Sequence, residues 1–186
     1  MLSAPLHAEC KNKNLNPEIL MTRLLVGALA AALNVPIAAF TPAPPASVVG
    51  PPWISIEYPV NPYDATTRDA FLVVHAFHHG VPTAFPVSGT AEGLVNGQRR
   101  TITLEFQKAS RSGEYALRKQ WPDQGTWTLV IGVMQGPEDR VTAIVDLAAD
   151  GQVARVNVPT RKEGSWVVPA KVVMADVEAG LKARAR

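Results

Sequence analysis

Hydrophobic and polar positions alternate along much of the chain from Trp53 onward, which is the period expected of strands with one buried face. The stretch Arg99–Phe106 shows this clearly, with Ile102, Leu104 and Phe106 on one face. Other runs are rich in β-branched and aromatic residues and also predict strands. Eight runs are of these kinds: WISIEYPV, AFLVVHAFHH, RRTITLEF, GEYALRKQW, GTWTLVIGVMQ, VTAIVDLAA, QVARVNVP and SWVVPAKVV.

Turn signals separate nearly all of these runs. Asn96-Gly97 and Asp150-Gly151 predict hairpins with type I′ turns, because both central residues of such a turn need positive φ. Gly113 and Gly125 each stand where a strand begins after a turn, a position that favours glycine. Short strands with turns about every 8–12 residues predict an all-β fold, an antiparallel sandwich or barrel of seven or eight strands over residues 53–173.

The C-terminal segment, residues 174–186, follows a different pattern. Val177 and Leu181 stand four residues apart among Ala, Glu, Lys and Arg, which predicts one short helix with a narrow apolar stripe. Such a stripe either packs on the sandwich or contacts a partner. We expect it to pack on the sandwich, since apolar stripes usually face a core.

An apolar run, Leu24–Phe40, follows Arg23 and is broken by Pro36 before a region of small residues. This order is typical of a secretory signal peptide, here residues 21–40, and predicts a periplasmic or secreted protein. The alternatives are a membrane anchor that remains uncleaved and a buried helix. As an anchor the run is short, because roughly 20 apolar residues are needed to cross a bilayer.

The other N-terminal residues differ from this segment in character. Residues 1–20 lack its apolar pattern and are interpreted as an extension upstream of a true start at Met21. Residues 41–52 predict an extended, proline-rich linker. The only cysteine, Cys10, lies upstream of the apolar run, so we expect neither a disulfide in the mature chain nor a lipoprotein anchor.

Composition and charge argue against disordered and nucleic-acid-binding proteins. Hydrophobic residues make up 47% and charged residues 18% of the 186 residues, a globular composition. The formal net charge is only +2, and the basic residues are dispersed except for a few adjacent pairs. This charge is too sparse for a nucleic-acid footprint, so we expect no nucleic-acid partner.

The densest set of metal-ligand side chains is His75, His78 and His79. In an extended strand His75 and His79 share a face but lie about 13 Å apart at ~3.3 Å per residue, too far apart to share one metal ion. His78 and His79 face opposite sides unless the strand has already ended there. We expect His75 to be a half-buried strand residue, with His78 and His79 at the solvent end of the strand.

Further ligands and catalytic groups are sparse. A metal site would need Asp64, Asp69 or Glu92, the carboxylates nearest the histidines in sequence. The chain has no Gly-x-Ser-x-Gly motif, cysteine nucleophile or phosphate-binding glycine loop, and Ser88-Gly89 is interpreted as a turn or bulge. We therefore expect no catalytic residues and no enzymatic activity.

Two stretches, HHGVPTAFPVSGTAEG and SGEYALRKQWPDQGTWTLVIGV, resemble the YtkA-like and CopC-like group of bacterial immunoglobulin-like sandwiches. The similarity covers residues 71–133 and rests on a Gly-x-Pro turn, a Gly-x-Tyr strand start and a Gly-x-Trp-x-Leu strand start, at Gly80–Pro82, Gly113–Tyr115 and Gly125–Leu129. The resemblance implies an immunoglobulin-like sandwich. It also implies an exported module of a group often associated with copper handling, respiratory-complex assembly or signalling.

The aromatic residues of these stretches also have a structural explanation. Tyr115 and Trp127 enter their strands at an end of the sandwich, where a large ring closes the core while its polar tip meets water or a carbonyl. Trp121 is expected to cover the loop side of the core.

The function expected from the sequence is a non-catalytic, exported module without a cofactor that binds a protein or an envelope component. The candidate binding residues are Tyr58, Tyr63, Asp64 and Trp121. The alternative is a periplasmic copper-binding module that uses His75, His78 and His79. Its two methionines beyond the linker are not clustered, which favours Cu(II) over soft Cu(I).

Overall fold

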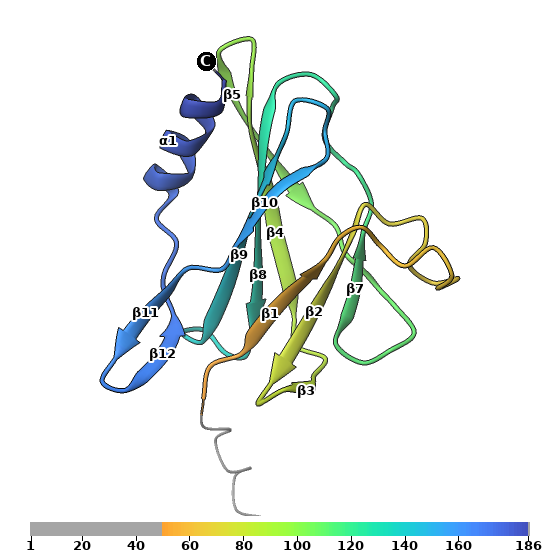
Figure 1. Cartoon of the computed structure of the whole chain (residues 1–186), viewed down its shortest axis with the longest axis vertical. Coiled ribbons are helices and arrows are strands. Elements are labelled where there is room, and N and C mark those ends of the chain that lie inside the picture. The colour runs from red at the N-terminus through yellow and green to blue at the C-terminus, as the bar shows by residue number, and fades with distance from the viewer. Residues whose placement is uncertain (1–49, 186) are drawn as a thin grey trace, which may run out of the picture. The chain divides into compact units, whose positions relative to one another are not determined.

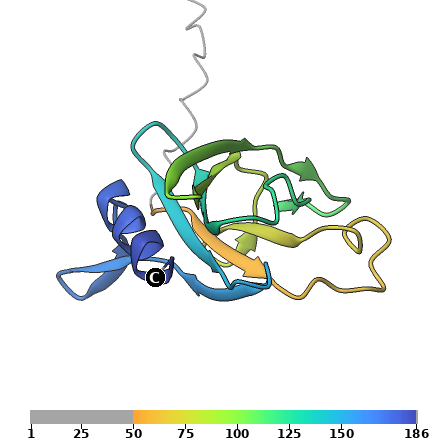
Figure 2. The same cartoon turned by 90° about the horizontal axis from the view of Figure 1, so that it is seen from above.

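Two antiparallel β-sheets face each other across one hydrophobic core (Figures 1 and 2). The computed structural model describes residues 50–185, and the predictions for residues 1–20, 21–40 and 41–49 lie outside the described residues. In chain order the elements are β1 (Trp53–Glu57), β2 (Leu72–His78), β3 (Val81–Pro82), β4 (Val87–Val95), β5 (Gln98–Leu104), β6 (Gln107–Lys108), β7 (Glu114–Leu117), β8 (Thr126–Met134), β9 (Arg140–Leu147), β10 (Val153–Asn157), β11 (Thr160–Glu163), β12 (Trp166–Pro169) and α1 (Met174–Arg184).

The two sheets have five strands each. The first sheet has the order β1-β2-β7-β6, with β3 paired to β2, and the second has the order β10-β9-β8-β4-β5. The β11–β12 hairpin belongs to neither sheet. Inward-facing side chains from alternate positions fill the space between the sheets, as Val74 in β2 and Leu129 and Ile131 in β8 illustrate.

This arrangement confirms the predicted all-β, antiparallel sandwich with a C-terminal helix. Each predicted run contains a strand, while β3, β4, β6 and β11 lie outside those runs. The β4–β5 hairpin turns at Asn96-Gly97, where φ is 50° and 76°, as the predicted type I′ turn requires. Ile102, Leu104 and Phe106 contact the core from one face, also as predicted.

The turn at Asp150-Gly151 is not of the predicted type. Only Gly151 has positive φ, at 79°, and the loop is three residues long. The N–H of Gly151 donates to the carbonyl of Ala148 at 3.0 Å, and the N–H of Ala148 donates to the carbonyl of Gln152 at 2.8 Å. This pattern fits a type I turn followed by a left-handed glycine, the common three-residue hairpin.

The interpretation of Ser88-Gly89 as a turn or bulge was wrong, because both residues lie inside β4 between β5 and β8. Gly89 faces the core, where a Cβ atom would come within 2.7 Å of the carbonyl oxygen of Val130. The glycine therefore permits a close approach between strands. Gly93 has a similar role, since a Cβ atom there would lie 2.5 Å from the ring of Trp127.

Two aromatic rings close the core as predicted. Tyr115 is 5% exposed, and its hydroxyl donates to the backbone carbonyl of Phe85 at 2.5 Å. Trp127 is 3% exposed, and its indole N–H donates to the carbonyl of Gln124 at 2.9 Å. Burial raises the pKa of the Tyr115 hydroxyl. Each ring thus fills the interior while its polar atom meets a carbonyl.

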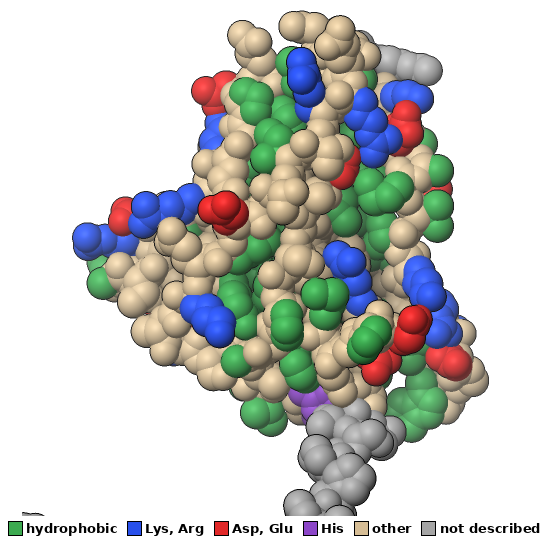
Figure 3. All heavy atoms as spheres, turned by 180° about the vertical axis from the view of Figure 1, so that it is seen from behind, with side chains coloured by type: hydrophobic (Ala, Val, Ile, Leu, Met, Phe, Trp, Pro, Cys, Tyr) green, Lys and Arg blue, Asp and Glu red, His purple; other side chains and the backbone are tan. Residues whose placement is uncertain are grey.

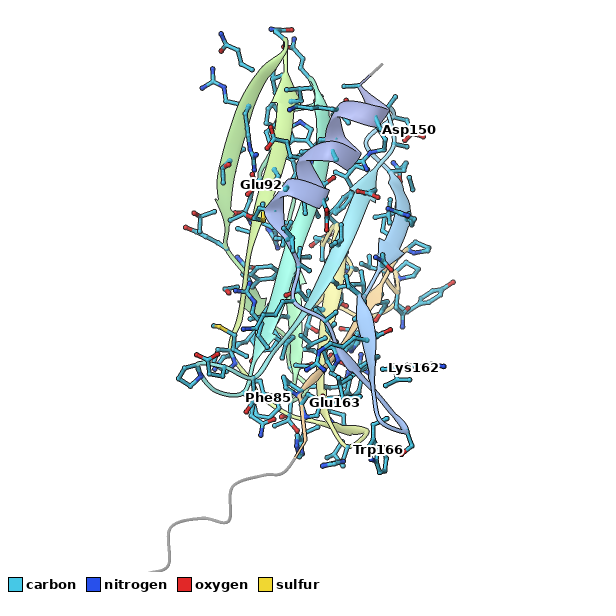
Figure 4. The ribbon with its side chains drawn as sticks, turned by 90° about the vertical axis from the view of Figure 1, so that its left-hand side faces the viewer. Phe85, Glu92, Asp150, Lys162, Glu163 and Trp166 are labelled. Atoms are coloured by element: carbon cyan, nitrogen blue, oxygen red, sulfur yellow. The ribbon has the colours of Figure 1, made fainter. Side chains whose placement is uncertain are left out.

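The helix α1 lies on the outer face of the second sheet, outside the sandwich (Figures 2 and 4). Val177 and Leu181, 4% and 2% exposed, pack against Val130 and the half-buried Ile144, which confirms the predicted packing of the apolar stripe. Among residues 50–185, no helix has the length and hydropathy needed to cross a membrane.

Two buried carboxylates of the sheet hold the helix in place. Glu92 accepts hydrogen bonds from Thr90, Thr101 and Arg99, and Arg99 also pairs with Glu178 of α1 at 2.8 Å. Burial alone would raise the pKa of Glu92, but the two hydroxyls and the Arg99 guanidinium together lower it.

The second carboxylate is Asp146, which is 4% exposed. It pairs with Arg184 of α1 at 2.6 Å and with Arg155 of β10 at 2.9 Å, and it accepts a hydrogen bond from Thr128 at 2.9 Å. Outward positions of a strand are normally solvated, but here the helix covers Asp146, and both of its carboxylate oxygens find partners within the protein.

Candidate functional site

His75 occupies the predicted half-buried position on β2, on the outer face of the first sheet. Its Nε2 lies 2.8 Å from Oε2 of Glu57 on β1, and its Nδ1 lies 3.5 Å from Oε1 of Glu114 on β7. The two ring nitrogens point in different directions. A metal ion bound to either nitrogen would therefore lie beside one of the two carboxylates but not beside both. His75, Glu57 and Glu114 therefore bridge three neighbouring strands and do not form a chelating set.

This row of charges continues into the loop between β1 and β2. Oε2 of Glu114 accepts from Arg111 at 2.9 Å, and Arg111 pairs with Asp64 at 3.2 Å. The pKa of Asp64 is lowered because Thr66 donates through its hydroxyl and its backbone N–H, with a smaller effect from the Arg111 charge. Asp64 thus anchors the loop to the start of β7.

His78 and His79 are brought together because β2 ends at His78. His79 and Gly80 have φ of 48° and 79° and form a two-residue turn, across which His78 pairs with Val81 of β3. The two imidazole rings consequently lie edge to face with their centroids 4.2 Å apart. They do not face opposite sides, as they would within a continuing strand.

The pair lies next to Gly50, where a Cβ atom would come within 3.0 Å of Nε2 of His79. Nε2 of His78 is buried and makes no hydrogen bond among the described residues. Phe85 presents its ring edge-on to His78 at 6.0 Å. Within residues 50–185, no three His, Cys, Asp or Glu side chains are grouped so as to hold a metal ion.

The remaining predicted residues lie in different environments. Trp121 is 4% exposed and packs edge-on against Phe71 at 5.0 Å, so it fills the core on the loop side and has little surface for a partner. Tyr58 is half-buried and its hydroxyl donates to Gln152. Tyr63 is 94% exposed. Glu92 lies under α1 on the second sheet (Figure 4), so it cannot share a metal site with the histidines of the first sheet.

Sequence reasoning predicted the strand β12 but missed β11 and the exposed hairpin that the two strands form, which we call the arm (Thr160–Pro169). Trp166 and Val167 are 76% and 59% exposed on it. The arm turns through Gly164-Ser165, with φ of 61° at Gly164, as in a type II′ hairpin. That Gly-Ser dipeptide was the available signal. It was passed over because the TRKE segment before it has no alternation.

Comparison with known proteins gives no further guidance, because no family model, curated protein or solved structure matches the chain significantly. The resemblance to the YtkA-like and CopC-like sandwiches therefore stays a prediction. Basic and acidic side chains are interspersed on the face that Figure 3 shows, so that face carries no broad patch of one sign.

Proposed function

We propose that this chain is an exported, non-catalytic binding module of the cell envelope that docks against a lipid surface through its arm. The observation that carries the proposal is the exposure of Trp166 and Val167 on a hairpin that belongs to neither sheet. An isolated two-stranded hairpin is marginally stable in water, so contact with an external surface would stabilise it.

Both faces of the arm are open. Cross-strand pairing joins Glu163 to Trp166 and Lys162 to Val167, so the two exposed apolar side chains lie on opposite faces of the hairpin. Trp166 combines a large apolar ring with an N–H donor, the combination that favours the boundary between lipid and water. Arg161 pairs with Glu163 within the arm, so Lys162 supplies the net positive charge of the arm, which anionic headgroups attract.

Other exposed apolar side chains lie toward the same end of the domain. Trp53 begins β1 and Val81 lies in β3, and they are 39% and 63% exposed. In Figures 1 and 4, the arm extends toward the end at which β1 begins and β3 turns.

The test is the depth of Trp166 in vesicles of phosphatidylethanolamine and phosphatidylglycerol with brominated acyl chains. The full chain and its Trp166→Phe variant are compared by tryptophan fluorescence. We expect a quenchable, blue-shifted component in the full chain that the variant lacks. Trp121 and Trp127 are buried and contribute a constant background, and Trp53 is common to both chains.

A second reporter gives the matched control. Tyr63→Trp, made in the Trp166→Phe chain, places a tryptophan at a position that is 94% exposed in the β1–β2 loop, and we expect it to remain unquenched. Equal quenching of the full chain and the Trp166→Phe chain overturns the proposal and leaves a protein partner as the occupant of the arm. Quenching of the control reporter equal to that of Trp166 also overturns it, because docking would then have no preferred end.

A second candidate function is metal binding at the His78–His79 pair, favoured by the buried Nε2 of His78 that lacks a partner among the described residues. The two imidazoles fit Cu(II) or Zn(II) as partial ligands, with water completing the coordination. A metal bound there would link β2 to the turn that follows it.

We expect Cu(II) or Zn(II) to raise the melting temperature of the chelator-treated chain. Metal at about 100 times its dissociation constant adds roughly 2.7 kcal/mol to the free energy of unfolding. His78→Gln should abolish the rise, while His75→Gln, at a histidine engaged with Glu57 and Glu114, should retain it. A rise of equal size in His78→Gln would show that the metal binds elsewhere.

A further inference from the structure

The outer face of the second sheet contains a groove of about 710 Å³ beside the start of α1. Its floor comes from β4, β5, β8 and β9, and its sides come from residues 137–140 and the segment before α1, residues 170–174. Figure 4 views this face of the sheet, with α1 lying across it. The volume lies in the usual range for small-ligand sites, roughly 300–1,000 Å³.

The floor carries hydroxyl groups from adjacent strands. Thr90 of β4 pairs with Thr103 of β5, and Ser88 of β4 lies in one cross-strand row with Gly132 and Thr142. These positions alternate with the inward-facing core residues, so their side chains point outward into the groove. A floor of this kind presents several hydrogen-bond donors and acceptors in a flat array.

Arg140 reaches across this floor because residue 132 is glycine. A Cβ atom at Gly132 would lie 2.5 Å from Nη2 of Arg140, so the guanidinium occupies space that any other side chain would take. Lys171 lines the groove from the segment before α1. Among residues 50–185, neither Arg140 nor Lys171 is within ion-pair distance of a carboxylate.

The acidic residues of the groove do not cancel these charges. Glu92 lies beneath the groove and is already paired with Arg99. Glu138, the other carboxylate in the lining, is exposed. Within the part of the chain that the structure describes, two cations without an ion-pair partner and one exposed carboxylate therefore line the groove, which gives it a net positive charge.

Apolar side chains complete the lining. Val130 lies in the floor, and Pro137, Val172 and Met174 lie at the sides. A ligand with one apolar face and several polar substituents would match this combination. A sugar ring has that form, with C–H groups on its faces and hydroxyls at its edge.

We infer that the groove binds a polyhydroxylated anion, a sugar that carries a carboxylate or a phosphate. Arg140 and Lys171 bind the anionic group, the guanidinium offering paired donors that match either kind of oxyanion. The Ser and Thr hydroxyls bind the sugar hydroxyls, and Val130, Val172 and Met174 contact the ring. This site lies away from the arm and does not depend on docking to lipid.

The test is calorimetric titration of the full chain with glucuronate, glucose 6-phosphate, glucose and inorganic phosphate. We expect both sugar anions to bind, and glucose and inorganic phosphate each to bind at least about tenfold more weakly, since each lacks one half of the recognition. A preference between the two sugar anions distinguishes a carboxylate from a phosphate ligand. Glucose binding as tightly as both anions, or no binding of either sugar anion at millimolar concentration, overturns the inference.

Variants locate the site. Arg140→Gln and Gly132→Ala should each weaken binding of the preferred anion by about tenfold or more, the first by removing the charge and the second by displacing the guanidinium. Gly136→Ala is the matched control, because a Cβ atom there would meet nothing within 4 Å. Thermal denaturation checks that each variant is folded. Unchanged affinity in a folded Arg140→Gln chain would place the anion elsewhere.

Discussion

Replacing Asp146 with alanine is expected to lower the free energy of unfolding by about 3 kcal/mol and to release α1 from the second sheet. Asp146 is 4% exposed and joins Arg184 of the helix to Arg155 and Thr128 of the sheet. Removing the carboxylate leaves the Arg184 guanidinium, whose side chain is only 27% exposed, without its counter-charge. A partly buried charge without a partner is costly because neither water nor protein solvates it fully.

Chemical denaturation measures the loss of stability, and hydrogen exchange of the α1 amides measures release of the helix. Glu163→Ala is the control, since it breaks the Arg161–Glu163 pair, whose side chains are 55% and 63% exposed. Exposed pairs contribute at most about 1 kcal/mol, so this variant should stay close to the wild type. Similar losses from the two variants would show that Asp146 does not anchor the helix.

The architecture could be predicted because it rests on local patterns. Alternation in the run that became β5 indicated one buried face, the β-branched and aromatic content of the run that became β8 indicated a strand, and the Asn96-Gly97 turn set the register of a hairpin. The strand β4 was missed because its local pattern was misleading. Its glycines at 89 and 93 favour turns in isolation, and only the close approach of Val130 and Trp127 explains them.

Covering of the outer face of the second sheet was harder to foresee. Val177 and Leu181 indicate that the helix packs on something, but the period of the strands assigns Glu92 and Asp146 to a solvated face. Their burial follows from where the helix lies, a tertiary fact that no local pattern contains. The groove beside α1 depends on the same placement, so sequence reasoning passed over Arg140 and Lys171.

The relative placement of the His78 and His79 rings depends on one backbone angle, φ of His79. A strand that continued through His79 would place its ring on the face opposite His78, whereas a positive φ at His79 brings the two rings together. Nothing in the side-chain pattern distinguishes these outcomes. The following Gly80 was the only hint, because two successive residues with positive φ make a type I′ turn.

Gly113→Ala is expected to destabilise the chain by about 3 kcal/mol or more, through backbone strain and a steric clash together. Gly113 has φ of 75°, and a Cβ atom there would lie 2.6 Å from the carbonyl oxygen of Ala76 and 2.9 Å from the backbone nitrogen of Thr83. These two atoms hydrogen-bond to each other at 2.9 Å, and Ala76 also donates to the carbonyl of Gly113 at 2.8 Å. The backbone of β2 therefore cannot move aside without losing hydrogen bonds.

Gly80→Ala separates the two contributions. Gly80 has a nearly identical φ of 79°, but a Cβ atom there would meet nothing within 4 Å. Alanine at this position should cost only the backbone strain, about 1 kcal/mol. Urea denaturation of both variants gives the difference, which measures how closely the strands approach at the start of β7. Equal losses would mean that the clash at Gly113 is relieved by a small local shift and that glycine is required there only for its backbone angle.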